Sequence, residues 1–356
     1  MVYGATGHTG RFVVDELLRR GLTPVLTGRS AERLAALAPR YADLERCEVG
    51  VDDSHLGRAV AGVGVVVNCA GPFLDTALPL ARAAVEAGVH YLDVTAEQPV
   101  VSRLYRELDR AARNAGVAVV PAMAFYGGLA DLLLTAALDG GSQADEVEIA
   151  IGLDRWWPTP GTRVTGARNT SVRQVIQGGE LVPLPNPAPT RTWCYPGPLR
   201  EQPVVELPFS EVITIHRHLD IGELRSYLNT TALEDIRDTT TSTPLPADEA
   251  GRSAQQFVVD VLVRRGSDVR RIICSGRDIY AVSAPVVVEG AARLLDGRHR
   301  GPGAMAPGQA FDASDVLDAL ERDTDGLAIE RDRHSSDGPV IRDGRPRQDS
   351  NLGQAN

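Results

Sequence analysis

Three glycines open this chain in the spacing G-x-x-G-x-x-G, within the stretch "MVYGATGHTGR". A strand-like segment precedes them and an amphipathic, helix-like segment follows. In that setting Gly4 permits a tight turn off the strand, Gly7 lets backbone amides approach a phosphate, and Gly10 lets the helix pack closely on the sheet. We therefore predict that a dinucleotide pyrophosphate binds at Gly4, Thr6, Gly7, Thr9 and Gly10. A tight turn without a ligand is the alternative.

The residues after the second expected strand distinguish between the two nicotinamide dinucleotides. NAD sites usually carry an acid there, which binds the ribose 2′-hydroxyl. Here "VLTGRS" ends in Arg29 and Ser30, and no acid occurs before Glu32. A guanidinium suits a 2′-phosphate, so the pattern favours NADP. Alternatively, Arg29 is solvated and Ser30 only caps a helix. Asp52, after the third expected strand, is predicted to lie near the adenine, with a loop cap as its alternative.

The first 125 residues alternate short β-rich runs with helix-like segments. The β-branched run "VGVVVN" at 63–68 indicates a strand buried on both faces. Helices between such strands predict an α/β fold with a Rossmann-type, doubly wound parallel sheet over residues 1–125. Only three residues precede the first turn, whereas strands usually run longer. We therefore expect that the natural start lies upstream or that these residues were lost.

After residue 125 the pattern changes. Alternating segments, including "VITIHRHL" at 212–219, predict further strands, and Gly266-Ser267-Asp268 predicts a hairpin turn. We expect an α+β domain with a largely antiparallel sheet over residues 126–280. Helices over 281–325, one capped by Asp312 or Ser314, are expected to follow, and then a disordered tail over 326–356.

Composition narrows the classes of partner. A formal net charge of −10 argues against non-specific binding to nucleic acid or to an anionic membrane surface. The longest apolar runs are too short to span a bilayer, and no secretory start is evident. Four scattered cysteines predict no disulfide framework and no metal site, and they fit a cytoplasmic protein. A homodimer is left open.

Several stretches together resemble saccharopine dehydrogenase-like oxidoreductases, a group that includes saccharopine reductases and trans-acting enoyl reductases. They are "VYGATGHTGR", "LTGRS", "VVVNCAGPF", "GVHYLDVTAEQ" and the closing "GRDIYAVSAPVVVEGAARLLDG" with "GPGAMAPGQAFDASDVLDAL". The resemblance runs to about residue 322. It implies a Rossmann domain, a second domain carrying the substrate surface, C-terminal helices that return to the first domain, and NADP(H) hydride chemistry. It also places one loop against the nicotinamide ribose, namely Ala70, Gly71, Pro72 and Phe73, and Asp93 to Glu97 at the interdomain cleft.

One departure from that family affects the expected site. Members commonly carry Gly-Phe-Asp after the sixth strand, whereas this chain keeps Phe125 and then has Tyr126 and two glycines. A reductase of this kind needs at most one proton donor besides its cofactor. Tyr126 and Asp131 are the candidates, with His90 and Glu97 also considered. As alternatives, Tyr126 lines a domain interface and Asp131 caps a helix.

In the second domain, Arg163, Arg168 and Arg173 form either an anion clamp, for a carboxylate or a phosphopantetheine arm, or a solvated loop. The adjacent Trp156 and Trp157 either wall an apolar pocket or fill an interface.

The sequence thus predicts an NADP(H)-dependent oxidoreductase that reduces a C=N, C=C or C=O bond of a small metabolite or a carrier-bound acyl group. One alternative is a trans-acting enoyl reductase of polyketide or lipid synthesis. The other is a non-catalytic NADP-binding scaffold or redox sensor.

Overall fold

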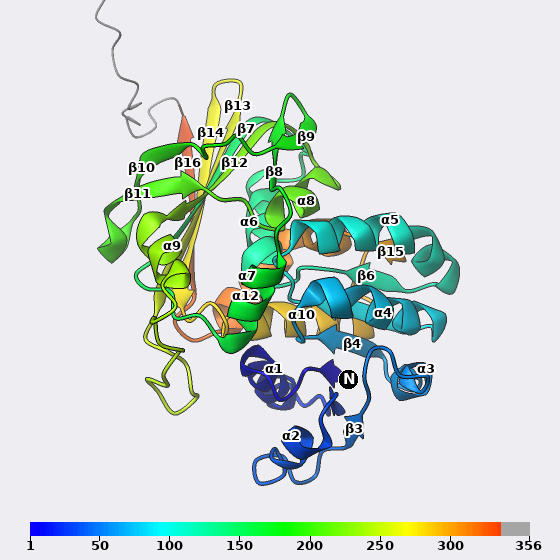
Figure 1. The fold of residues 1–356 in the computed structure, drawn as a ribbon. Coiled ribbons are helices and arrows are strands. Elements are labelled where there is room, and N and C mark those ends of the chain that lie inside the picture. The colour runs from blue at the N-terminus through cyan, green and yellow to red at the C-terminus, as the bar shows by residue number, and fades with distance from the viewer. Residues whose placement is uncertain (336–356) are drawn as a thin grey trace, which may run out of the picture.

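The computed structural model describes residues 1–335, which form two sheets side by side (Figure 1). The first is a seven-stranded parallel sheet in the order β15-β6-β5-β4-β1-β2-β3. Its strands are β1 (Val2–Tyr3), β2 (Leu26–Gly28), β3 (Arg46–Glu48), β4 (Val65–Asn68), β5 (His90–Asp93), β6 (Ala118–Val120) and β15 (Gly303–Ala304). The strand order confirms the predicted Rossmann-type architecture.

Helices join these strands as the sequence pattern predicts. They are α1 (His8–Arg19), α2 (Ala31–Ala35), α3 (Leu56–Val60), α4 (Phe73–Glu86) and α5 (Gln98–Ala115). All four residues of β4 are buried, which matches its unbroken run of apolar residues. Helix α5 buries one face against the sheet and ends at Gly116 in a left-handed conformation, with φ +71°.

The second sheet has nine strands, and all but one of its strand pairs are antiparallel. The main order is β10-β11-β12-β7-β13-β14-β16. Strand β8 pairs with β12, and β9 pairs with β8; only β12 and β7 pair in parallel. The strands are β7 (Gln143–Leu153), β8 (Gln174–Gln177), β9 (Glu180–Pro183), β10 (Thr190–Cys194), β11 (Glu201–Glu206), β12 (Asp220–Asn229), β13 (Gln256–Arg265), β14 (Asp268–Arg277) and β16 (Ala328–Ser335). The largely antiparallel second sheet and the β13–β14 hairpin are as expected.

Short helices and turns accompany this sheet. They are η1 (Phe125–Leu129), α6 (Ala130–Ala137), α7 (Pro160–Arg168), η2 (Gly197–Leu199), α8 (Glu211–His216) and α9 (Thr230–Arg237). The prediction of a strand over 212–219 is wrong, because Glu211–His216 is helical. Residues 211–215 are all buried, so no exposed face marks the helical period.

The C-terminal elements return to the first domain. They are α10 (Ser283–Leu295), α11 (Pro307–Ala310) and α12 (Ala313–Asp323). Helix α10 packs on α1, and β15 adds a strand to the first sheet. The Asp312 side chain caps α12 by accepting from the Asp315 amide.

The expected disordered tail needs correction at its start. Residues 328–335 form β16, which pairs with β14 along its length. Leu327 and Ile329 are buried, whereas Glu330 to Asp332 are exposed, as expected of a charged edge strand. Residues 336–356 of the expected tail lie outside the described residues.

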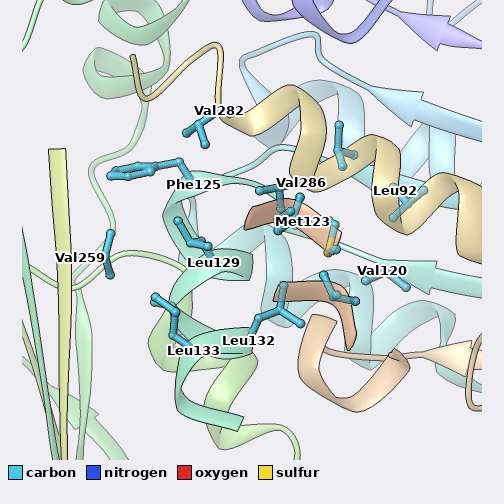
Figure 2. Close-up of a cluster of buried hydrophobic side chains, with 14 of the residues drawn as sticks. Leu92, Val120, Met123, Phe125, Leu129, Leu132, Leu133, Val259, Val282 and Val286 are labelled. Carbon is cyan, nitrogen blue, oxygen red and sulfur yellow. The ribbon is translucent and has the colours of Figure 1, made fainter. Parts of the chain in front are cut away.

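One continuous apolar core joins the two domains. Leu92 and Val120 of the first sheet, Leu129 and Leu132 near the start of α6, and Val259 of β13 belong to the same cluster (Figure 2). Helix α6 packs on β13 and β14 of the second sheet, α10 packs on β4 and β5 of the first, and both contribute buried apolar side chains to this cluster (Figure 1). The carboxyl ends of the parallel strands are therefore held at a fixed place against the second domain. Among residues 1–335, no helix is long and apolar enough to cross a membrane.

Candidate active site

The glycine-rich turn has the geometry of a phosphate-binding turn. Helix α1 begins at His8, and its N-cap residue Gly7 has no capping side chain. The first amides of α1 are therefore free for an anion. A Cβ atom built at Gly10 would lie 2.1 Å from the Gly4 carbonyl oxygen, so only glycine permits this approach of helix and turn. Thr6 and Thr9 are half-buried beside these amides.

The loop Ala70–Phe73 lies directly against this turn, at the carboxyl end of β4. A Cβ built at Gly4 would lie 2.9 Å from the Ala70 nitrogen. The Asn68 side-chain oxygen accepts from the Ala70 amide at 3.0 Å, and the Thr76 hydroxyl donates to the Ala70 carbonyl at 2.6 Å. The expected loop is thus brought to the expected turn and is held by side chains of β4 and α4.

A buried polar chain supports this loop from below. The Asn68 amide donates to the Tyr91 hydroxyl at 3.1 Å, and that hydroxyl donates to Asp93 at 3.0 Å. Asp93 also accepts from the backbone amides of Thr95 and Ala122. Burial raises the pKa of Asp93 to about 6 despite these donors. The network ties the ends of β4, β5 and β6 together.

Glu97 continues the polar surface beyond β5. One of its carboxylate oxygens accepts from the Phe73 amide at the start of α4, at 3.1 Å. The residue is 1% exposed, and its other oxygen has no hydrogen-bond partner within the described part of the chain. Burial raises the pKa of Glu97 to about 7. A buried carboxyl with such a pKa can give or take a proton near neutral pH.

Aromatic side chains close the site from the second domain. The Tyr126 ring lies 4.2 Å from the Phe209 ring and 5.5 Å from the Trp156 ring, centroid to centroid. Gly127 has φ +93°, and a Cβ there would lie 2.5 Å from the Ser210 hydroxyl oxygen. The glycine after Tyr126 therefore lets the turn after β6 approach the start of α8.

Four buried polar atoms at this place have no hydrogen-bond partner among residues 1–335. They are His8 Nε2, Glu97 Oε2, Tyr126 Oη and Glu211 Oε2. Three of the four groups are linked through contacts. The His8 ring meets the Tyr280 ring, the Tyr280 hydroxyl accepts from the Trp156 indole, and the Trp156 ring stacks on Tyr126. The Tyr126 ring packs on Phe209, whose amide donates to Glu211, and Glu97 connects to this group only through its neighbour Gln98, whose amide donates to the Phe209 carbonyl. We call these four residues the interdomain junction. Burying a polar atom without a partner costs roughly 1–3 kcal/mol of stability. The grouping of four such atoms makes the interdomain junction the candidate ligand site.

The opposite end of the expected cofactor site is more open. Arg29 is exposed after β2, and the Ser30 hydroxyl caps α2 by accepting from the Arg33 amide at 3.3 Å. Glu48 accepts from the Ala31 amide at 3.2 Å and so brings a carboxylate to this helix end. Asp52 is exposed just beyond β3. Arg29 is free to meet a phosphate, whereas Glu48 would have to turn away from it.

Asp131 is not part of the interdomain junction. Its two oxygens bond with His218 Nε2 at 2.7 Å and with the Gly308 amide at 3.0 Å. These contacts hold the end of α8 and α11 to α6. The geometry therefore favours a structural role for Asp131 over the expected proton donation. His90 is likewise structural, since its Nδ1 accepts from the Ala118 amide.

Other features expected to carry function lie elsewhere. Arg163 donates to the carbonyls of Asp238 and Thr241, and Arg168 pairs with Asp75 at 2.9 Å. No group of three metal-ligating side chains forms within residues 1–335. An open depression of about 570 Å³ along the outer edge of β3 contains no residue of the interdomain junction. This depression is therefore not the candidate active site.

Comparison with known proteins assigns the glycine turn to a known type of NADP-binding domain. Residues 1–120 match the model of the saccharopine dehydrogenase NADP binding domain. The first 120 residues are therefore similar to that domain. The match confirms the family resemblance and NADP as the cofactor of this domain. It does not assign the individual residues, which remain predictions.

Curated relatives match this domain and little more. A saccharopine dehydrogenase-like oxidoreductase of Bos taurus is 30% identical over 151 residues, which is 37% of this chain and 35% of the relative. A trans-acting enoyl reductase of Mycobacterium tuberculosis is 30% identical over 132 residues, 35% of this chain and 32% of the relative. The chain thus aligns with about a third of each relative.

Similarity of fold extends further than similarity of sequence. Saccharopine dehydrogenase (L-Glu forming) of Saccharomyces cerevisiae superposes with a TM-score of 0.65 over 93% of this chain and 99% of that chain, at 13% identity. Both domains of our chain therefore have the saccharopine dehydrogenase fold.

Sequence reasoning missed Glu211, Phe209 and Tyr280 as parts of the site. They come from distant segments of the second domain, and no local pattern marks them. Glu97 could have been weighted more highly, because an acid just after a parallel strand lies where such strands bind ligands.

Proposed function

We propose that this protein is an NADP(H)-dependent oxidoreductase that reduces a C=N, C=C or C=O bond of a small metabolite or a carrier-bound acyl group. The observation that carries the proposal is the meeting of two features. The uncapped glycine turn of a saccharopine dehydrogenase NADP-binding domain lies beside a junction with four unpartnered buried polar atoms. Buried polar atoms without partners beside a cofactor turn are candidates for contacts with a substrate.

The residues present fit the cofactor. The first amides of α1 would hold the pyrophosphate, Arg29 and Ser30 the 2′-phosphate, and Ala70–Phe73 the nicotinamide ribose, with Asp52 near the adenine. When bound, the nicotinamide supplies the hydride. The chain's own part is to orient the acceptor bond, to exclude water with its aromatic side chains, and to donate a proton. The Tyr126 hydroxyl is the proposed donor, since it is buried at this junction and has no hydrogen-bond partner among residues 1–335.

A trans-acting enoyl reductase is the second candidate. It is supported by the aligned mycobacterial relative of that name. Such an enzyme would take a carrier-bound enoyl thioester where a metabolite reductase would take a free small molecule.

A panel assay tests the proposal. NADPH oxidation is followed with imines, enoyl thioesters, and quinones and other carbonyl compounds as acceptors. We expect oxidation with one acceptor class, and thioesters alone would select the second candidate. NADPH binding without oxidation across the panel would instead indicate a scaffold or redox sensor.

A further inference from the structure

Arg173 is a half-buried cation beside the interdomain junction, and it forms no ion pair within the described residues. Its Nη1 donates to the Pro208 carbonyl at 2.5 Å, and its guanidinium carbon lies 5.0 Å from the centre of the Phe209 ring. No carboxylate oxygen of residues 1–335 lies within 4.0 Å of its guanidinium. Burial lowers the pKa of this guanidinium, and the nearby Glu211 carboxyl opposes that effect in part.

The other two arginines of the same segment already have partners. Arg163 binds backbone carbonyls, and Arg168 forms an ion pair with Asp75 at the edge of α4. Arg173 alone of the three lies against an aromatic ring of the junction, the Phe209 ring that packs on Tyr126. The structure thus separates residues that the sequence presented as one cluster.

The neighbouring Glu211 carboxyl group limits the negative charge that a ligand of Arg173 can carry. Glu211 directs one oxygen to the Ser226 hydroxyl and the Phe209 amide, and its other oxygen has no partner within the described residues. One guanidinium with the Glu211 carboxyl group nearby accommodates a monoanion better than a dianion such as a phosphate monoester.

The aromatic rings beside Arg173 indicate what kind of group the rest of the ligand carries. Tyr126, Trp156 and Phe209 form a connected aromatic wall beside Arg173. Trp156 and Phe209 are buried, so a ligand that reaches Arg173 would meet these rings, which favour a flat, apolar group over a flexible polar one. The guanidinium that would bind an anion and the rings that would bind a flat group thus lie next to each other.

We propose that Arg173 binds the carboxylate of the substrate, and that the substrate is a monocarboxylate with a flat unsaturated or aromatic body. This inference rests on the proposed function, because it places the carboxylate beside the proposed proton donor. A charge-assisted, two-point contact of this kind is expected to strengthen binding about 10- to 100-fold.

Binding of trans-cinnamate tests the proposal, with cinnamamide as its neutral counterpart. Quenching of tryptophan fluorescence reports binding, and NADPH is titrated separately against the same samples. We expect cinnamate to bind at least about 10-fold more tightly than cinnamamide. Arg173→Gln should remove that preference and Arg173→Lys should keep part of it, because lysine retains the charge without the planar fork. Arg168→Gln, in the same segment, should leave it unchanged.

Three results would overturn the inference: no binding of cinnamate by the wild type, equal binding of acid and amide, or equal losses in Arg173→Gln and Arg168→Gln. Circular dichroism shows whether each variant folds. If Arg173→Gln does not fold, the inference is tested by the preference of the wild type for cinnamate over cinnamamide and by the partial preference expected of Arg173→Lys. Failure of NADPH to bind while cinnamate binds through Arg173 would remove the proposed function and leave the anion site standing.

Discussion

Replacing Tyr126 by phenylalanine is expected to lower turnover about 100-fold, as is typical when a general acid is removed. The change deletes one hydroxyl that has no hydrogen-bond partner within residues 1–335 and leaves the ring contacts with Phe209 and Trp156 in place. NADPH affinity should therefore stay as in the wild type. Turnover is measured with the acceptor that the panel assay identifies, and NADPH affinity by titration.

Tyr195→Phe is the matched control. The Tyr195 hydroxyl is also buried and unpartnered in the described structure, but its ring packs in a separate cluster with Trp193 and Tyr227 on the second sheet. We expect this variant to keep full turnover. Full turnover in Tyr126→Phe, or an equal loss in both variants, would show that the Tyr126 hydroxyl does not donate the proton.

Glu97→Gln is expected to stabilise the protein at pH 8 and to flatten the pH dependence of its stability. The folded chain holds the Glu97 proton up to a pKa of about 7, whereas the unfolded carboxyl has its ordinary value of 4.5. Between these values the folded state binds more protons, so stability falls as pH rises. Above pH 7 the buried charge lowers the free energy of unfolding by about 3 kcal/mol, which glutamine removes. Glutamine can still accept from the Phe73 amide.

Urea unfolding at pH 5 and pH 8 measures this effect. Glu107→Gln is the control, because Glu107 also belongs to α5 but lies at the surface and pairs with Arg103. The control should gain no stability at pH 8. If Glu97→Gln and the wild type lose the same stability between pH 5 and pH 8, burial of Glu97 does not raise its pKa. A gain in stability on replacing Glu97 would fit a functional role, because proteins keep destabilising buried acids mainly where function requires them.

The first domain could be predicted from sequence because its signals are local. The glycine turn, the buried run ending at Asn68 and the Arg29-Ser30 pair each lie within a few residues of the structure they specify. The meeting of Gly4 with Ala70 then follows from the rule that parallel strands end at one edge.

The second domain could be predicted only as a class. Helix α8 is buried on every side, so its residues show no 3.6-residue period. The site residues there, such as Phe209, Glu211 and Tyr280, meet through long-range packing that no local pattern encodes. Asp131 shows the same limit, because its partners His218 and Gly308 are distant in sequence.

The central claim, an NADP(H) site at the glycine turn with Arg29 at the 2′-phosphate, is tested most directly by titrating the protein with NADPH and NADH. We expect NADPH to bind about 10- to 100-fold more tightly, the range of a charge-assisted phosphate contact. Arg29→Ala should remove most of that preference, and Arg33→Ala, on the exposed side of α2, should keep it. Equal affinity of the wild type for NADPH and NADH would contradict the account.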